Sequence, residues 1–153
     1  MSSLEVKVPP PALAAAIAVA MWGMSRLAPL LQVPGAARLG AAAAFVAAGV
    51  GFSAAGVVAF RRARTTVNPT KPEKASVLVS SGVYRMTRNP MYVGLSCVLV
   101  AWAVFLSSAW ALLGPAAFVL YIGHFQIVPE ERALVKLFGS EYTNYQARVR
   151  RWL

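Results

Sequence analysis

The sequence contains few residues that bind metals or form covalent cross-links. One cysteine, Cys97, and one histidine, His124, occur in 153 residues. A single cysteine excludes an intramolecular disulfide and a zinc site built from several thiolates. We therefore predict no metal site, and we interpret Cys97, which lies inside an apolar run, as a small hydrophobic residue.

Acidic residues are also scarce, because only 5 oppose 15 lysines and arginines. Such an excess of positive charge would suit a nucleic-acid partner if it stood alone. However, 58% of the residues are hydrophobic, well above the roughly 45 to 50% of soluble domains. We predict an integral membrane protein that contacts lipid headgroups through its basic residues and binds no nucleic acid.

Four apolar runs approach the ~20 residues needed to cross a bilayer. The first is interpreted as a retained span, because no basic segment of a signal peptide precedes it. The predicted fold is an all-α, multi-pass membrane protein with about four transmembrane helices and a C-terminal amphipathic helical segment. The runs are Pro11 to Leu31, Leu39 to Phe60, Met91 to Leu106 and Trp110 to Val128.

The basic residues predict the orientation, since lysine and arginine are retained on the cytoplasmic side. Twelve of the 15 lie between Arg61 and Pro90 or in the tail that follows Pro129. With four spans, the N-terminus, the central loop and the C-terminus share one side, predicted to be the cytoplasm. Arg148, Arg150 and Arg151 are interpreted as contacts with lipid headgroups.

Residues 1–60 are predicted to form two N-terminal transmembrane helices rich in small residues. Gly49, Gly51 and Gly56 are expected to mark a face where helices approach closely. Arg26 lies inside the first run, so it either extends to the interface or lines a polar cavity. The remainder, residues 61–153, comprises a cytosolic loop, a transmembrane hairpin and a C-terminal helix, and it is predicted to be the functional, cofactor-binding core.

This core contains a loop, Gly82 to Gly94, that leads directly into a predicted helix N-terminus. Helix N-termini offer unpaired amides to anionic groups. Arg85 and Arg88 add positive charge, and Tyr84 and Tyr92 add aromatic faces that suit a base or a cation. The alternative is a belt of basic and aromatic residues at the membrane surface.

The end of the fourth run carries further polar residues. On an α-helix, Tyr121, His124 and Glu131 share one face, and Gln126 and Glu130 share another. His124 and Glu131 are candidate catalytic residues, because polar groups at membrane depth are costly unless they function. The alternative is that these are interfacial residues at a helix end.

A final helix is predicted to begin at Pro129, with acidic residues in its first turn. Gly139 is expected to interrupt or end it. A second stretch through Tyr142, Tyr145 and Val149 is interpreted as an amphipathic segment lying on the membrane.

The order and spacing of these motifs, from about Val77 to the C-terminus, resemble the membrane methyltransferases of the isoprenylcysteine carboxyl methyltransferase and phospholipid methyltransferase type. The resemblance covers half of the chain. The matching residues are Leu78 to Tyr84, Arg88 to Gly94, Glu130-Glu131, Leu134, Phe138-Gly139, Glu141-Tyr142, Tyr145 and Arg148-Val149.

The resemblance implies an enzyme that uses S-adenosylmethionine as its methyl donor. Its acceptor would be a lipophilic small molecule or a prenylated substrate, such as an isoprenylcysteine-like carboxylate, a lipid amine or a small thiol. Glu130 would contact the cofactor's ammonium group. The full set of cofactor-binding residues implied is Ser76, Val77, Leu78, Val79, Tyr84, Arg88, Asn89, Pro90, Met91, Tyr92 and Glu130.

Two positions depart from the family pattern. Asn89 stands where the family often has histidine, and Gln126 stands where the isoprenylcysteine enzymes have an arginine that holds the substrate carboxylate. Gln126 is therefore a candidate substrate-binding residue of unknown partner. An amine or thiol acceptor would also require a base, for which His124 and Glu131 are the candidates.

A non-catalytic membrane protein of the same fold, with a structural or partner-binding role, is the alternative function. A transporter is disfavoured, because the apolar runs carry no paired carboxylates. The acceptor and the oligomeric state are not predicted.

Overall fold

The computed structural model describes residues 8–27, 31–64 and 77–153. These residues are mainly helical, and none of them forms a strand. The elements in chain order are α1 (Pro10–Leu27), α2 (Gly35–Arg62), the 3₁₀ turn η2 (Gly82–Arg85), α3 (Pro90–Leu106), the 3₁₀ turn η3 (Ala109–Leu112), α4 (Leu113–Ile122), the π-helical turn η4 (Gly123–Ile127), α5 (Val128–Phe138) and α6 (Ser140–Arg148).

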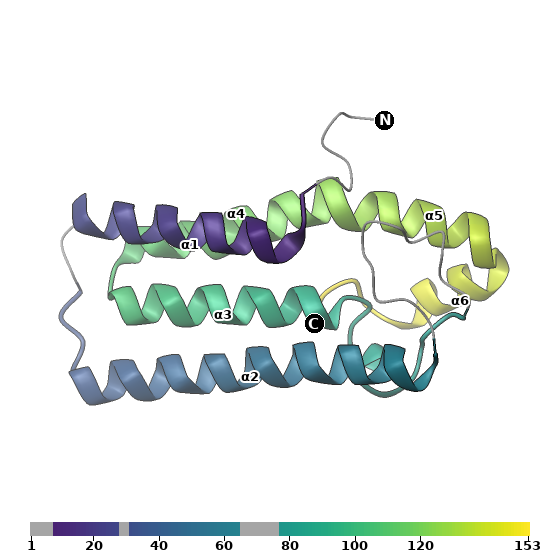
Figure 1. The fold of residues 1–153 in the computed structure, drawn as a ribbon, viewed down its shortest axis with the longest axis horizontal. Helices are drawn as coiled ribbons and strands as arrows, with labels where there is room; N and C mark the ends of the chain where they lie inside the picture. The colour runs from purple at the N-terminus through teal and green to yellow at the C-terminus, as the bar shows by residue number, and fades with distance from the viewer. Residues whose placement is uncertain (1–7, 28–30, 65–76) are drawn as a thin grey trace.

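The long helices run side by side in an elongated bundle, with α3 between α1 and α2 (Figure 1). Helices α4 and α5 form one long rod through η4, and α6 folds back at its end (Figure 1). We call the end of the bundle where α2 ends and α3 begins the site end. The opposite end, where α1 ends and α2 begins, is the far end.

Two helices among the described residues are long and apolar enough to cross a membrane. They are α2 and the continuous helical stretch Ala109–Phe138. Helix α3 is apolar but has only 17 residues. The all-helical fold with membrane-length helices is confirmed, whereas the count of four spans stays a prediction.

Helices α2 and α3 meet through small residues. A Cβ atom at Gly49 would lie 2.7 Å from the carbonyl oxygen of Gly94, and a Cβ atom at Gly94 would collide with Ser53. Gly56 lies against Met91 in the first turn of α3. The predicted contact face is confirmed for Gly49 and Gly56. It is wrong for Gly51, which is exposed and meets no atom within 4 Å.

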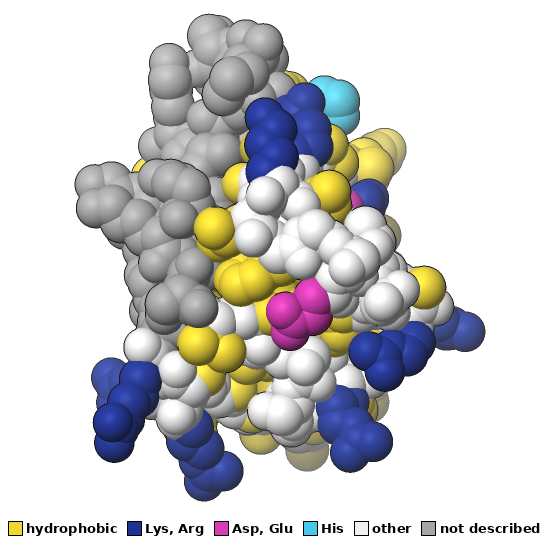
Figure 2. All heavy atoms as spheres, turned by 90° about the vertical axis from the view of Figure 1, so that its right-hand side faces the viewer, with side chains coloured by type: hydrophobic (Ala, Val, Ile, Leu, Met, Phe, Trp, Pro, Cys, Tyr) yellow, Lys and Arg dark blue, Asp and Glu magenta, His cyan; other side chains and the backbone are white. Residues whose placement is uncertain are grey.

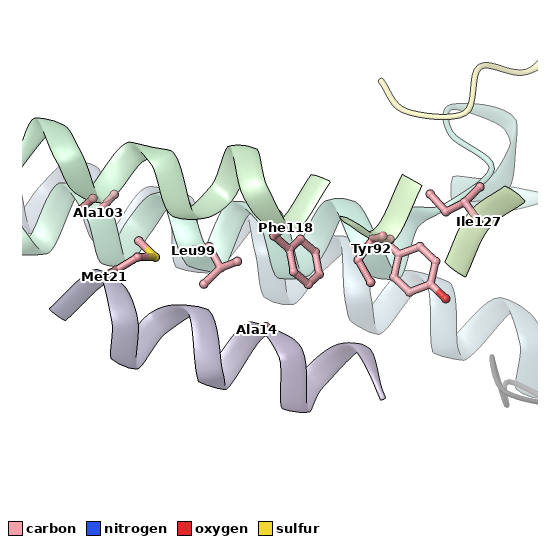
Figure 3. Close-up of a cluster of buried hydrophobic side chains, with 9 residues drawn as sticks. Ala14, Met21, Tyr92, Leu99, Ala103, Phe118 and Ile127 are labelled. Atoms are coloured by element: carbon pink, nitrogen blue, oxygen red, sulfur yellow. The ribbon is translucent and has the colours of Figure 1, made fainter. Parts of the chain in front are cut away.

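A buried apolar cluster joins α1, α3 and α4. Met21, Leu99 and Phe118 are its central side chains, one from each helix (Figure 3). Tyr92 lies in the same cluster near Ile127 (Figure 3). Burial of this kind contributes roughly 1.5 to 3 kcal/mol for each large side chain, and it fixes Tyr92 close to the start of α5.

The C-terminal helix α6 packs on protein. Tyr142 and Tyr145 are buried against Val79 and Tyr84, and the Tyr145 hydroxyl donates a 2.7 Å hydrogen bond to the Tyr84 carbonyl oxygen. The aromatic face that was assigned to the membrane surface thus covers the segment leading into α3.

Candidate functional site

Glu130, in the first turn of α5, receives two side-chain hydrogen bonds. The Tyr92 hydroxyl and the Gln126 Nε2 atom each donate to its Oε1 atom at 2.7 Å. The predicted shared face of Gln126 and Glu130 is confirmed by this contact. The segment that enters the α3–α4 hairpin and the one that leaves it therefore meet at one carboxylate.

The π-helical turn η4 determines which side chains face inward at this point. It places one extra residue in the turn before α5, and such turns recur at functional sites. Gln126 is buried, whereas His124 is exposed and lies edge-on to Phe125. Glu131 is buried, so the predicted common face of His124 and Glu131 does not form. A pattern of α-helical spacing alone cannot reveal such a turn.

A cavity of about 80 Å³ lies beside Glu130 and is bounded by seven parts of the chain. They are the end of α2, the segment before η2, η2 itself, the loop before α3, η4, α5 and α6. The lining residues are Phe60, Val77, Leu78, Val79, Tyr84, Arg88, Asn89, Ile127, Glu130, Glu131, Leu134, Phe138, Tyr142 and Tyr145.

Most of the predicted cofactor residues line this cavity. They are Val77, Leu78, Val79, Tyr84, Arg88, Asn89 and Glu130.

The other predicted residues have different positions. Tyr92 reaches the cavity through its hydrogen bond to Glu130. Pro90 and Met91 lie in the first turn of α3 and contact the region around Gly56. Ser76 lies outside the described residues, and His124 is not part of the lining.

Part of the lining was not assigned to the site from the sequence. Leu134 and Phe138 follow Glu130 at intervals of four residues, so the helical spacing did contain that signal. Tyr142 and Tyr145 were assigned to the membrane surface instead. Only the turn at Gly139, with φ of 53°, directs them back over the cavity.

Glu131 is held by two arginines. Its Oε1 atom lies 3.0 Å from Arg88 Nη2, and its two oxygens receive Arg151 Nε at 3.0 Å and Nη2 at 2.6 Å. Arg151 is therefore an internal partner, which corrects its interpretation as a headgroup contact. The Nε atom of Arg88 is buried and finds no acceptor in the part of the chain that the structure describes.

The C-terminal residues also hold the loop before α3. The Arg151 carbonyl oxygen accepts hydrogen bonds from Asn89 Nδ2 at 2.9 Å and Thr87 Oγ1 at 3.2 Å. The backbone amide of Arg88 donates to the Arg150 carbonyl oxygen at 3.0 Å. Asn89, which departs from the family pattern, thus fixes the tail against the site.

Three tyrosines around the cavity are held in their neutral form. Burial raises the pKa of Tyr142 to about 12, and it raises the pKa values of Tyr84 and Tyr145 further above the ordinary range. At physiological pH they offer neutral hydroxyl groups and aromatic faces.

Lysine and arginine side chains project around the rim of the site end, with an acidic side chain near its centre (Figure 2). A basic rim suits a protein end that lies beside anionic headgroups. It agrees with the charge pattern of the sequence, although the side of the membrane stays a prediction.

The site offers the groups needed for a ligand that carries a cation, an anion and an aromatic part. Glu130 is the acidic group, the Nε atom of Arg88 is a donor without an acceptor among the described residues, and the tyrosines are aromatic walls. Ligand pockets usually measure ≈ 300 to 1,000 Å³, so this cavity of about 80 Å³ holds only part of such a ligand. A neighbouring hollow of about 570 Å³, lined by Ala59 and Val83 among others, offers further space. No group of three potential metal ligands occurs among the described residues.

Comparison with known proteins gives one family match and several relatives. The sequence model of the phospholipid methyltransferase family matches residues 37–141. An uncharacterized Haemophilus influenzae protein is 46% identical over 63 residues, which are 41% of this chain and 100% of that protein.

Two relatives carry names that state an activity. Methanethiol S-methyltransferase 1 of Bradyrhizobium diazoefficiens is 39% identical over 44% of this chain and 22% of its own length. Protein-S-isoprenylcysteine O-methyltransferase of Saccharomyces cerevisiae is 34% identical over 52% of this chain and 34% of its own length. The chain thus covers about a fifth to a third of these two proteins. No solved structure matches.

Proposed function

The chain belongs to the phospholipid methyltransferase family, and on this premise we propose that it transfers a methyl group from S-adenosylmethionine to a lipophilic acceptor in the membrane. The observation that carries the proposal is the half-buried Glu130 carboxylate, held by hydrogen bonds from Tyr92 and Gln126 beside the cavity. A partly buried carboxylate that accepts two hydrogen bonds and is still open to a cavity is suited to a cationic ligand.

Different residues of the site are assigned to different parts of the cofactor. Glu130 binds the ammonium group, and the Nε atom of Arg88 donates to the carboxylate. Tyr84 and Tyr142 contact the base or the sulfonium through their rings. When bound, S-adenosylmethionine supplies an electrophilic methyl group on a positively charged sulfur. The role of the chain is to orient the two reactants and exclude water, so catalysis is mainly a matter of proximity.

Gln126 and His124 face different surroundings, so we assign them different roles toward the methyl acceptor. Gln126 positions Glu130 from inside the bundle and is the candidate contact for the acceptor's polar group. His124 is exposed on the outer side of η4, where only an acceptor arriving from the bilayer would meet it. A carboxylate acceptor needs no base, whereas an amine or thiol does, and His124 is the proposed base in that case.

Glu131 has a different proposed role. Both of its oxygens are engaged by Arg88 and Arg151, although it lines the cavity. We assign it to holding Arg88 toward the cofactor. The site end, with the central loop and both termini, is proposed to lie in the cytoplasm of a four-span protein.

A non-catalytic protein of the same fold is the second candidate. The small volume of the cavity favours it, and so does Gln126, which stands where the isoprenylcysteine enzymes have an arginine. The names of the relatives and of the family suggest which methyl acceptors to test in order to distinguish the enzyme from the non-catalytic protein.

The test is transfer of a labelled methyl group by the purified full chain in liposomes. Phosphatidylethanolamine, a prenylcysteine analogue and a lipophilic thiol form the acceptor panel. We expect transfer to one of these classes, its loss in Glu130→Gln and its retention in Glu141→Gln, which alters an exposed carboxylate on α6. No transfer to any acceptor, together with no cofactor binding, would establish the non-catalytic candidate.

A further inference from the structure

The far end of the bundle contains a second, chemically different site. A hollow of about 430 Å³ is lined there by Arg26 of α1, Arg38 of α2 and three aromatic side chains. The Arg26 guanidinium carbon lies 5.2 Å from the centre of the Trp22 ring, and that of Arg38 lies 5.8 Å from the centre of the Phe105 ring. Arg26, predicted either to extend to the interface or to line a polar cavity, thus lines a hollow at the end of its helix.

Neither arginine is neutralised within the described chain. The described acidic residues, Glu130, Glu131 and Glu141, all belong to α5 and α6 at the site end. The Nε atom of Arg38 is buried and finds no acceptor among the described residues. Buried donors in proteins are almost always paired, so this hollow is prepared for an anionic group.

An apolar groove continues from this hollow along the bundle. It measures about 650 Å³ and runs between α1 and α2, with α3 as its floor. Trp102 and Phe105 line both the groove and the hollow, so the two form one continuous surface. Trp102 also donates its Nε1 hydrogen to the Ala18 carbonyl oxygen at 3.0 Å, which fixes α1 against α3. The remaining groove wall is mainly alanine, leucine and valine.

We propose that this surface binds an anionic phospholipid, with its phosphate between Arg26 and Arg38 and an acyl chain in the groove. The charge of the hollow selects an anionic headgroup, and the apolar groove selects a chain. Because the basic hollow and the apolar groove are continuous, a ligand that fills both must be amphiphilic. The lipid lies in the leaflet opposite the candidate methyl-transfer site, so the binding does not depend on the proposed activity.

The experiment is native mass spectrometry of the delipidated full chain in detergent, titrated with equimolar phosphatidylglycerol and phosphatidylcholine of identical chains. We expect one tightly bound phosphatidylglycerol. A basic residue near a membrane surface strengthens anionic binding about fivefold, so the double variant Arg26→Gln/Arg38→Gln should reduce the preference by an order of magnitude or more. The matched control, Lys136→Gln/Arg150→Gln, removes two exposed charges from the site end and should keep it.

A second variant tests the groove independently of charge. Ala15→Phe places a ring in the groove at an exposed position of α1, so it should weaken phosphatidylglycerol binding while helix content by circular dichroism stays unchanged. Glycerol phosphate, which has the headgroup but no chain, should not compete. Four results would each overturn the proposal. They are equal binding of the two lipids, an unchanged preference in the arginine variant, competition by glycerol phosphate, and a stable dimer in which a second copy of the chain covers the groove.

Discussion

The Tyr92 hydroxyl donates a 2.7 Å hydrogen bond to Glu130, 38 residues later in the chain. The bond links the first turn of α3 to the first turn of α5 across the hairpin. It gives the carboxylate a fixed direction in surroundings where an unpaired polar group would be costly. The candidate cofactor site is organised around this pair.

Replacing Tyr92 by phenylalanine should test how much this direction matters. The ring stays in its buried cluster, and Glu130 keeps its bond to Gln126. A hydrogen bond to a charged group is worth about 1.5 to 3 kcal/mol, so we expect cofactor affinity measured by calorimetry to fall about tenfold or more. Tyr121→Phe, at a half-buried tyrosine on α4, is the matched control. Equal affinity of the Tyr92 variant and the unmodified protein would show that the bond does not position Glu130.

Removing Glu131 and removing its partner Arg151 should have different effects on the stability of the protein. Glu131→Gln leaves Arg88, whose side chain is 11% exposed, without its carboxylate partner. Arg151→Gln removes a side chain that is 40% exposed and leaves Glu131 paired with Arg88. Because an unpaired buried charge is costly, we expect Glu131→Gln to lower the free energy of unfolding by roughly 2 kcal/mol or more, and Arg151→Gln by clearly less.

Thermal unfolding in detergent, followed by circular dichroism, measures both variants. A larger loss in Arg151→Gln than in Glu131→Gln would contradict the assignment of Glu131 as the centre of the cluster.

The sequence was sufficient for the elements whose physics is local. Long apolar runs predicted the helices, Pro90 marked the start of α3, and Gln126 and Glu130 met as their spacing requires. Tyr84 and Arg88 were indicated by the residue types of the loop before α3. Val77, Leu78 and Val79 were reached only through the resemblance to a family, because neither the burial nor the contacts of an extended segment follow from its own residues.

The features that were missed depend on non-local geometry. The π turn at Gly123–Ile127 rotates His124 out of the face that it was expected to share with Glu131. Arg151 finds a carboxylate only because the tail returns to α5, a path that no sequence spacing encodes. The amphipathic pattern that contains Tyr142 and Tyr145 is the same for a helix covered by lipid and for one covered by protein, so the sequence could not distinguish the two.

Close contact between α2 and α3 should make Gly49 intolerant of a side chain. Gly49→Ala places a Cβ atom 2.7 Å from a backbone oxygen of Gly94, which cannot move without shifting a helix. We expect a loss of stability of about 1 to 3 kcal/mol, measured by the midpoint of thermal unfolding in detergent. Gly51→Ala meets open space and should be neutral or stabilising by up to ~1 kcal/mol, from helix propensity. Similar losses in both variants would refute the glycine contact.

Tyrosine burial at the site end predicts loss of stability at alkaline pH. The pKa of Tyr142 is raised to about 12, from an ordinary value of ≈ 10. The folded protein therefore binds this proton more tightly than the unfolded chain, and its contribution to stability is complete below pH ≈ 10 and falls as pH rises toward 12. Ultraviolet absorbance of tyrosinate should show delayed ionisation that moves to lower pH on unfolding. Ionisation of every tyrosine near pH ≈ 10 in the folded protein would contradict this packing of α6.

In the proposed function, Glu130 binds the positively charged ammonium group of the methyl donor. Isothermal calorimetry with S-adenosylhomocysteine, which keeps the ammonium group, measures it most directly on the unmodified chain, Glu130→Gln and Glu141→Gln in the same detergent. We expect binding to the unmodified chain, affinity lower by about tenfold or more in Glu130→Gln, and no change in Glu141→Gln. Equal affinity in all three proteins, or no binding to the unmodified chain, would contradict this role of Glu130.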